Sequence, residues 1–173
     1  MFHNFKKLPL FLLLSAIAFP SLADWQLNQN NSTVNFTTVK KEHLIENHTF
    51  DLVSATISKH GLIELAIDLS SVNTKIDIRN QRMKEHLFNT ALFPKATFST
   101  KVGIKALEKL TLGASKSMNI KGSIDLHGLK QDVAVNVLVV KVSANKLLVI
   151  SQESLIIKAQ DFDLVAGINK LKE

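Results

Sequence analysis

Hydrophobic and polar residues alternate along most of the chain after residue 24. In residues 62–69, for example, Ile63, Leu65 and Ile67 would share one face of a strand, with Glu64 and Asp68 on the opposite face. A period of two residues is what a strand with one buried and one solvated face requires. The pattern predicts strands in five segments: residues 32–36, 62–69, 118–126, 131–140 and 147–150.

Polar turn signals separate these segments. They occur at residues 28–31, 59–61, 127–128 and 143–145. Short strands joined by short polar links are typical of antiparallel neighbours. No helical segment follows each strand, which argues against a doubly wound α/β fold.

Residues 78–89 break the alternation. Their charges cluster, β-branched residues are nearly absent, and Met83 and Leu87 lie four positions apart. This pattern predicts a short helix over about residues 78–89 with one apolar edge. Pro94 ends it, because the residue before a proline is pushed out of the helical region. We expect the helix to cover one end of the sheet.

The remaining 150 residues hold about eight or nine such strands, and closure into a barrel would remove the unpaired edges of that sheet. We therefore predict an all-β fold, an antiparallel eight-stranded barrel with one short helix. A barrel of eight strands is wide enough either to be filled by side chains or to hold one small ligand.

The N-terminal residues have the features of a secretory signal peptide. Lys6 and Lys7 precede a twelve-residue apolar run, residues 8–19, which is shorter than the roughly 20 residues that a bilayer span requires. Small residues at Ser21 and Ala23 form a cleavage site. We expect residues 1–23 to be removed and the mature protein, residues 24–173, to be exported to the periplasm. No second apolar run reaches transmembrane length.

Composition and charge narrow the function classes. The absence of cysteine excludes a disulfide framework, thiolate metal sites and a cysteine nucleophile. The formal charge of +6 falls to +4 in residues 24–173, because Lys6 and Lys7 leave with the signal peptide. The remaining lysines and arginines are spread along the sequence, without the clustered stripe of a nucleic-acid-binding protein. We expect no nucleic-acid partner.

Motifs of enzymes and metal sites are nearly absent. The sequence has no Gly-x-Ser-x-Gly, His-Glu-x-x-His, Walker or Gly-x-Gly-x-x-Gly motif. His86 and His127 are isolated, and His43 and His48 lack the spacing of a zinc site. Asp161 and Asp163 would lie on one face of a polar strand edge. We predict no catalytic residue, no metal and no cofactor.

Several segments resemble, in order, the motifs of one family. Residues 79–88 followed by 93–98 resemble "R-[DN]-x-R-M-x-x-x-L-F … F-P-x-A-x-F", and residues 122–128 resemble "G-x-L-x-x-x-G". Further matches lie at residues 25–27, 32–36, 68–74 and 159–164. The chain is similar in this way to the YceI-like, or polyisoprenoid-binding-like, proteins of the bacterial periplasm.

The resemblance implies an extended, lipocalin-like barrel whose long apolar cavity takes a polyprenyl chain or an isoprenoid quinone. It also implies that Asp161 and Phe162 are structural. The chain departs from the family pattern twice. His48 stands where many members have glycine, and residues 127–130 replace the more typical Gly-Val-Thr-Lys.

The inward-facing apolar residues are the candidate ligand contacts. If the barrel is hollow they line it, and if it is filled they pack on one another as an ordinary core. Rings are few in residues 24–173, with six phenylalanines, one tryptophan and no tyrosine, which favours the hollow form. The candidates are Val34, Phe36, Ile63, Leu65, Ile67, Ile120, Ile124, Val133, Val135 and Val137.

Arg79 and Arg82 are candidates for contact with a polar headgroup, since guanidinium groups suit anionic oxygens. The alternative is that they are solvated or paired with Asp77 and Glu85.

Three functions follow from these patterns. The first is a periplasmic carrier for an isoprenoid or other amphipathic lipid. The second is an envelope-stress module with a filled barrel that binds another protein and no lipid. The third, a hydrolase or lipid-modifying enzyme, would need His86 or His127 near an acid and a nucleophile. The oligomeric state stays open, a homodimer included.

Overall fold

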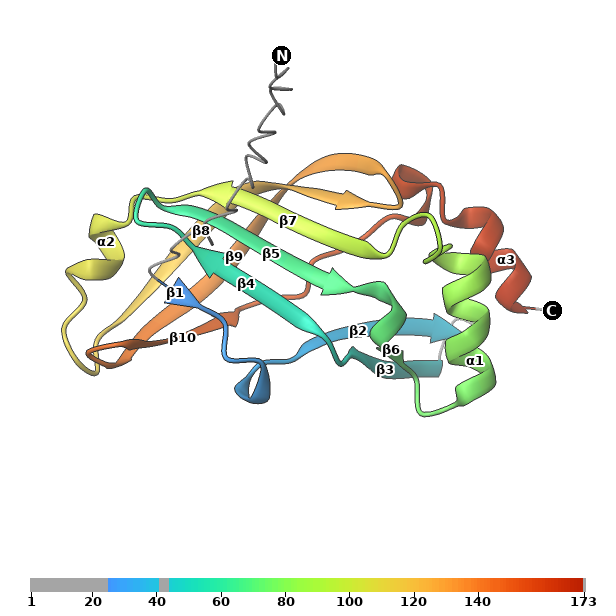
Figure 1. Ribbon diagram of the computed structural model, residues 1–173, viewed down its shortest axis with the longest axis horizontal. Helices are drawn as coiled ribbons and strands as arrows, with labels where there is room; N and C mark the ends of the chain where they lie inside the picture. The colour runs from blue at the N-terminus through green and yellow to red at the C-terminus, as the bar shows by residue number, and fades with distance from the viewer. Residues whose placement is uncertain (1–24, 41–43, 173) are drawn as a thin grey trace, which may run out of the picture.

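The computed structural model describes residues 25–40 and 44–172, and it is mostly antiparallel β-sheet (Figure 1). The expected signal peptide, residues 1–23, and His43 lie outside the described residues. Two sheets carry the architecture. The larger has seven strands in the order β1-β4-β5-β7-β8-β9-β10, and the smaller has three in the order β2-β3-β6.

The strands of the larger sheet are β1 (Trp25–Gln26), β4 (Val53–Ile57), β5 (Leu62–Asp68), β7 (Lys95–Lys101), β8 (Ser115–Leu126), β9 (Leu129–Ser143) and β10 (Lys146–Ser151). Those of the smaller sheet are β2 (Val34–Lys40), β3 (Leu44–Phe50) and β6 (Val72–Asn73). All neighbouring strands pair antiparallel.

The predicted antiparallel all-β fold is confirmed, with a different strand count and closure. Ten strands in two sheets replace the single eight-stranded barrel among the described residues. The seven-stranded sheet curls into a half-barrel (Figure 1). The ammonium of Lys141 on β9 lies 4.8 Å from the ring centre of Trp25 on β1. A cation–π contact therefore joins β1 and β9, which do not pair through their backbones; we call this junction the seam.

The predicted helix is confirmed, as α1 (Asp77–Arg82) followed by one π-helical turn (Met83–Leu87). Its expected apolar edge is buried, since Met83 and Leu87 both contribute to the core. Asn80 fixes its start. The side-chain oxygen of Asn80 accepts hydrogen bonds from the backbone amide and the hydroxyl of Thr74, at 2.8 and 2.7 Å.

Two further helices were not predicted, α2 (Lys105–Glu108) and α3 (Val165–Lys172). Short 3₁₀ turns occur at Gln29–Asn31, Leu69–Ser71 and Ala159–Phe162. The last of these corrects the strand edge expected at Asp161 and Asp163. The chain there turns back, with Asp163 in the left-handed region at φ 53°, to bury Phe162 and start α3.

The β8–β9 hairpin turns on two residues, His127 and Gly128. Both have positive φ, 53° and 75°, which is the primed turn geometry that matches the twist of the flanking strands. A side chain at position 128 would also meet the ring of Phe93, whose nearest carbon lies 2.8 Å from an ideal Cβ. The departure from the family pattern at residues 127–130 therefore still forms a tight hairpin.

Buried apolar residues form two separate clusters. We call the end with α1 and α3 the closed end; its cluster comprises Phe50, Val53, Leu69, Val72, Met83, Leu87, Phe88, Ala96, Leu126, Phe162 and Leu164. We call the end with α2 the open end; its cluster has three buried members, Leu107, Val137 and Val139, among half-buried neighbours. The two ends lie at opposite sides of the view in Figure 1.

Candidate functional site

The open end contains an apolar cavity of about 40 Å³. Strands from both halves of the curled sheet contribute to it, and α2 closes it through Leu107, which is 4% exposed. All nine lining residues are apolar: Ile57, Ile63, Val102, Leu107, Met118, Ile120, Val139, Leu147 and Val149. A site of this composition suits an apolar group, because no polar side chain in it would lose hydration.

The alternation of the strands creates this lining. Residues directly opposite each other in antiparallel strands place their side chains on the same face of the sheet. Ile57 is paired with Ile63, and Val139 is paired with Val149. Because the period is two, every second residue of these strands faces the cavity and the intervening residues face solvent.

Strand β10 is the thinnest wall of the cavity. It is an edge strand, and Val149 lines the cavity although 53% of the residue is exposed. Its neighbours Leu148 and Ile150 are also exposed, at 44% and 47%. Exposed apolar residues continue beyond the strand at Leu155, Ile156 and Ile157. At this edge a single, half-exposed strand therefore separates the cavity from solvent.

Trp25 lies beside the cavity and is the only tryptophan in the sequence. It is paired with Ile57, so it lies on the face that lines the cavity. Lys141 caps its ring, and the segment from Gly113 to Ala114 is hydrogen-bonded to the backbone of that lysine, at 2.9 Å in both directions. The fluorescence of Trp25 should therefore report on what enters the open end.

The ring of Phe98 packs against Gly122, which lies between Ile120 and Ile124 on β8. Phe98 on β7 is paired with Leu65 and Ile124, which pack against the closed-end cluster. An ideal Cβ at Gly122 would lie 2.6 Å from two carbons of this ring. Only glycine leaves room for Phe98 there. Ile120, two residues earlier on β8, already lines the cavity.

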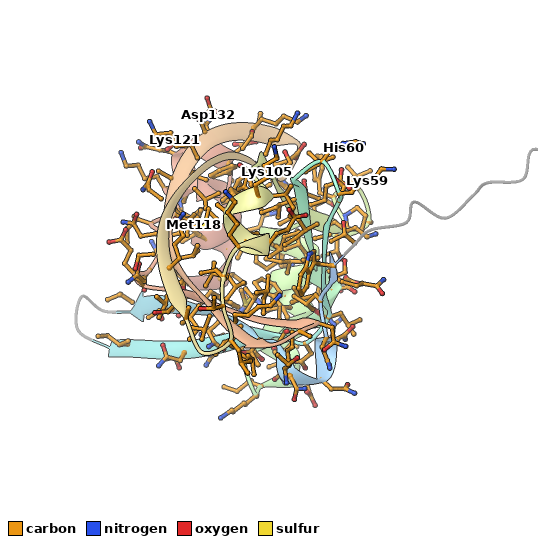
Figure 2. The ribbon with its side chains drawn as sticks, turned by 90° about the vertical axis from the view of Figure 1, so that its left-hand side faces the viewer. Lys59, His60, Lys105, Met118, Lys121 and Asp132 are labelled. Atoms are coloured by element: carbon orange, nitrogen blue, oxygen red, sulfur yellow. The ribbon has the colours of Figure 1, made fainter. Side chains whose placement is uncertain are left out.

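The residues predicted to line one cavity are split between the two ends. Val34, Phe36, Leu65, Ile67 and Ile124 pack against the closed-end cluster, and Ile120 and Val135 pack against the open-end cluster, of which Val137 is a member. Only Ile63 and Ile120 line the 40 Å³ cavity. Val133 instead borders a shallow depression of about 460 Å³ beside β8 and β9, together with Lys121, Gly122, Asp132 and Ala134. Figure 2 shows Lys121 and Asp132 on the outside of the curled sheet.

Seven lining residues were missed from the sequence. Val139 lies one alternation beyond the predicted Val137, so extending the same face of that segment would have found it. Leu147 lies in the recognised segment 147–150, from which no lining residue was predicted. Leu107 gave no such signal, because α2 has only four residues and no amphipathic period. The other missed residues are Ile57, Val102, Met118 and Val149.

Arg79 and Arg82 lie at the closed end and contact protein groups. Nη1 of Arg79 is 3.0 Å from Oε2 of Glu46 on β3, a different partner from the Asp77 and Glu85 weighed from the sequence. Arg82 donates a hydrogen bond to the backbone carbonyl of Lys170 on α3. The two guanidinium groups thus tie α1 to β3 and to α3, away from the cavity.

Three of the described histidines, His48, His86 and His127, take part in local contacts. The hydroxyl of Thr38 and Nε2 of the buried His48 are 3.1 Å apart, and the His48 ring is 5.1 Å from that of Phe36. His127 packs on Phe93, with ring centres 4.4 Å apart, and Nε2 of His86 is 4.0 Å from a carboxylate oxygen of Glu85. Within the described ranges, no three potential metal ligands come together. No helix among those residues is long and apolar enough to cross a membrane.

The described residues thus form a curled antiparallel sheet with a small apolar cavity under one edge. The YceI-like domain model matches residues 25–172, and the chain belongs to this family. A polyisoprenoid binding domain from Saccharophagus degradans, implicated in plant cell wall breakdown, is 38% identical, with a TM-score of 0.79 over 87% of this chain and 83% of that one. The family predicted from the motifs is confirmed.

More distant structures share the fold. BcnA of Burkholderia cenocepacia is 20% identical, with a TM-score of 0.64 over 83% of this chain and 87% of its own. The Campylobacter jejuni YceI protein is 18% identical, with a TM-score of 0.54 over 83% and 84% of the two chains. The comparison with curated proteins gave no match.

Proposed function

We propose that this protein is a periplasmic binding protein that carries an amphipathic isoprenoid-type lipid, either a polyprenyl chain or an isoprenoid quinone, and that it catalyses no reaction of its own. The observation that carries the proposal is the wholly apolar cavity behind the half-exposed Val149. Support comes from the relative described as a polyisoprenoid binding domain, which is 38% identical. The lipid tail would lie under β10 and the polar group would stay outside.

The size of the cavity sets a condition on this proposal. Ligand pockets usually measure about 300–1,000 Å³, whereas the cavity measures about 40 Å³. Binding therefore requires that β10 and its half-buried neighbours move outward. The energy is available, since each buried CH₂ contributes about 0.8 kcal/mol. At that value, three or four isoprene units offset an association cost of about 4–15 kcal/mol.

Export of the protein is part of the same proposal. We expect signal peptidase to cleave after Ala23, so that the mature protein binds its lipid in the periplasm. N-terminal sequencing of the protein from a periplasmic extract should begin at Asp24. A sequence that begins at Met1 would indicate an uncleaved anchor instead.

Three measurements test lipid binding. The protein, purified without strong detergent, should release an isoprenoid lipid on solvent extraction, identified by mass spectrometry. The lipid-free protein should then change its Trp25 fluorescence saturably on titration with geranylgeraniol, a prenol of four isoprene units. Thermal unfolding should shift upward with the same prenol, because a ligand that binds only the folded state stabilises it.

Neighbouring residues of β10 provide a matched pair of variants. Val149 lines the cavity, whereas Leu148 is paired with Val140 on the other face and is exposed to a similar degree. We expect Val149→Asp to weaken prenol binding at least about tenfold, because the carboxylate would be desolvated by the tail. Leu148→Asp should change binding less than about twofold. Equal effects of the two variants would contradict the placement of the tail under β10.

A protein-binding module without a lipid is the second candidate. The exposed apolar residues 148–150 and 155–157 favour it, because contiguous apolar surface often marks a protein interface. This candidate predicts no extracted lipid and no response of Trp25 to the prenol. It also predicts that Leu148→Asp and Val149→Asp weaken capture of the partner alike.

A further inference from the structure

The fold gathers lysines at the open end. Three stretches of the chain meet there, residues 58–61, 101–116 and 141–147, and together they carry seven lysines and one glutamate, a net charge of +6. Hydrogen bonds join them: the amide of Val102 donates to Gly61 at 2.9 Å, and that of Gly113 donates to Lys141 at 2.9 Å. The lysines are Lys59, Lys101, Lys105, Lys109, Lys116, Lys141 and Lys146. We call this surface the lysine-rich end.

The rest of residues 24–173 has the opposite balance. It carries 12 lysines and arginines against 14 acidic residues, a net charge of −2. All lysines of the lysine-rich end except the half-buried Lys141 are exposed. Figure 2 faces this end of the molecule and labels Lys59, His60 and Lys105 there. The charge of the protein is therefore concentrated at one end of its long axis.

Exposed apolar side chains accompany these lysines. Leu112, in the loop after α2, is 73% exposed, and Val142 on β9 is 45% exposed. Leu62, paired with Lys101, is 43% exposed. Lysines around protruding apolar side chains fit the surface of an anionic bilayer, where the cations meet lipid phosphates and the apolar groups enter the headgroup region.

We propose that the lysine-rich end docks on an anionic phospholipid bilayer. The cavity beside β10 would then lie close to the membrane, so that a lipid tail passes between bilayer and cavity with little exposure to water. The docking does not depend on the identity of the cargo or on whether there is one, since the charge and the exposed leucine are present in any case. The lysine-rich end carries exposed apolar side chains among its lysines, and this combination favours a membrane over an acidic protein as the partner.

Co-sedimentation of the protein with vesicles tests the docking. The vesicles contain phosphatidylethanolamine with phosphatidylglycerol, or phosphatidylcholine alone as the neutral reference, and no prenyl lipid. We expect binding to the anionic vesicles only, and its loss when NaCl is raised to about 1 M, where the Debye length falls to about 3 Å. Because prenyl lipids are absent, this result is independent of the proposed lipid carriage.

Variants at the two ends give a control with the same change of net charge. The triple variant Lys59→Gln, Lys105→Gln, Lys109→Gln should bind anionic vesicles at least about tenfold more weakly. The control Lys95→Gln, Lys130→Gln, Lys170→Gln removes three exposed lysines at the closed end and should change binding less than about twofold. These six lysines are all exposed, so both variants should fold, which circular dichroism checks.

Two leucine variants test whether an apolar side chain enters the bilayer or whether charge alone accounts for the binding. Leu112 and Leu92 are 73% and 70% exposed, but Leu92 lies at the closed end. Leu112→Ser should weaken vesicle binding and Leu92→Ser should not. The proposal is overturned if the wild-type protein binds neutral and anionic vesicles equally, if the two lysine triples lose binding equally, or if neither leucine matters.

Discussion

The two ends of this protein are built from different side chains. Five of the six phenylalanines in residues 24–173 lie at the closed end, and the sixth, Phe98, stands at the boundary. Rings contact each other there, with centres 4.9 Å apart for Phe36 and Phe50 and 5.9 Å for Phe50 and Phe88. The open-end cluster is aliphatic, with only three buried members. Rings fill a curved interior efficiently, and the open-end cluster contains none, although Trp25 lies beside its cavity, so this end is the one left with space.

The helices at the two ends also differ. At the closed end α1, its π-helical turn and α3 pack together, and Arg82 donates a hydrogen bond to α3. At the open end the only helix in the described residues is α2, which has four residues. Such a helix has little stability of its own. We infer that the closed end holds the fold while the open end is free to move for a ligand, and the predictions below test this division.

The largest effect is expected from Phe162→Ala. Phe162 is 2% exposed in the closed-end cluster, so its truncation leaves a cavity among buried neighbours. We expect the free energy of unfolding to fall by about 3–5 kcal/mol. Urea unfolding followed by circular dichroism measures it. A loss below about 1 kcal/mol, far less than the truncation of a buried phenylalanine normally costs, would show that the closed end does not hold the fold.

Leu107→Ala is the corresponding truncation of a buried side chain at the open end. Leu107 is also nearly buried, at 4%, but its neighbours in the cluster are mostly half-buried and can close over the gap. We expect a loss of about 2 kcal/mol, at the low end for a leucine truncation. The same urea experiment checks it. A loss as large as that of Phe162→Ala would remove the energetic difference between the two ends.

Gly167→Ala tests how α3 is seated on the closed end. An ideal Cβ at Gly167 would lie 2.3 Å from the carbonyl oxygen of His86 and 2.7 Å from Cα of Leu87, so α3 would have to move away. We expect the free energy of unfolding to fall by about 1–2 kcal/mol, even though alanine favours a helix. The exposed Asn169→Ala on the same helix is the control and should stay within about 0.5 kcal/mol.

Local patterns of the sequence predicted the elements well. Alternation identified β5, β8, β9 and β10, and the clustered charges around Met83 and Leu87 identified α1 with its π-helical turn. These features depend on neighbours two to four positions away, which the sequence displays directly. The positive φ of Gly128 also follows from the two-residue turn between two alternating segments.

The division of the interior could not be predicted in this way. Ile120 lines the cavity whereas Ile124 packs against the closed-end cluster, and the Phe98 ring that meets Gly122 between them comes from another strand more than twenty residues earlier in the chain. The lysine-rich end could not be predicted for the same reason, since its lysines come from three stretches that are separated in the sequence. Alternation tells which face of a strand is apolar, but not which segments share it or how much space they leave.

The smallest effect is expected at the seam of the open end. Lys141→Gln removes the ammonium that lies 4.8 Å from the ring centre of Trp25, while keeping a side chain of similar length. A cation–π contact at a partly exposed site contributes about 0.5–1 kcal/mol, so unfolding should become easier by that amount. The emission of Trp25 should change at the same time, because its ring loses the charge above it. Lys146→Gln, an exposed lysine of the same end, is the control and should alter neither quantity. If the seam is what opens for a ligand, Lys141→Gln should also speed the association of geranylgeraniol, measured by stopped-flow fluorescence. An unchanged association rate with an altered stability would mean that the lipid reaches the cavity by another path.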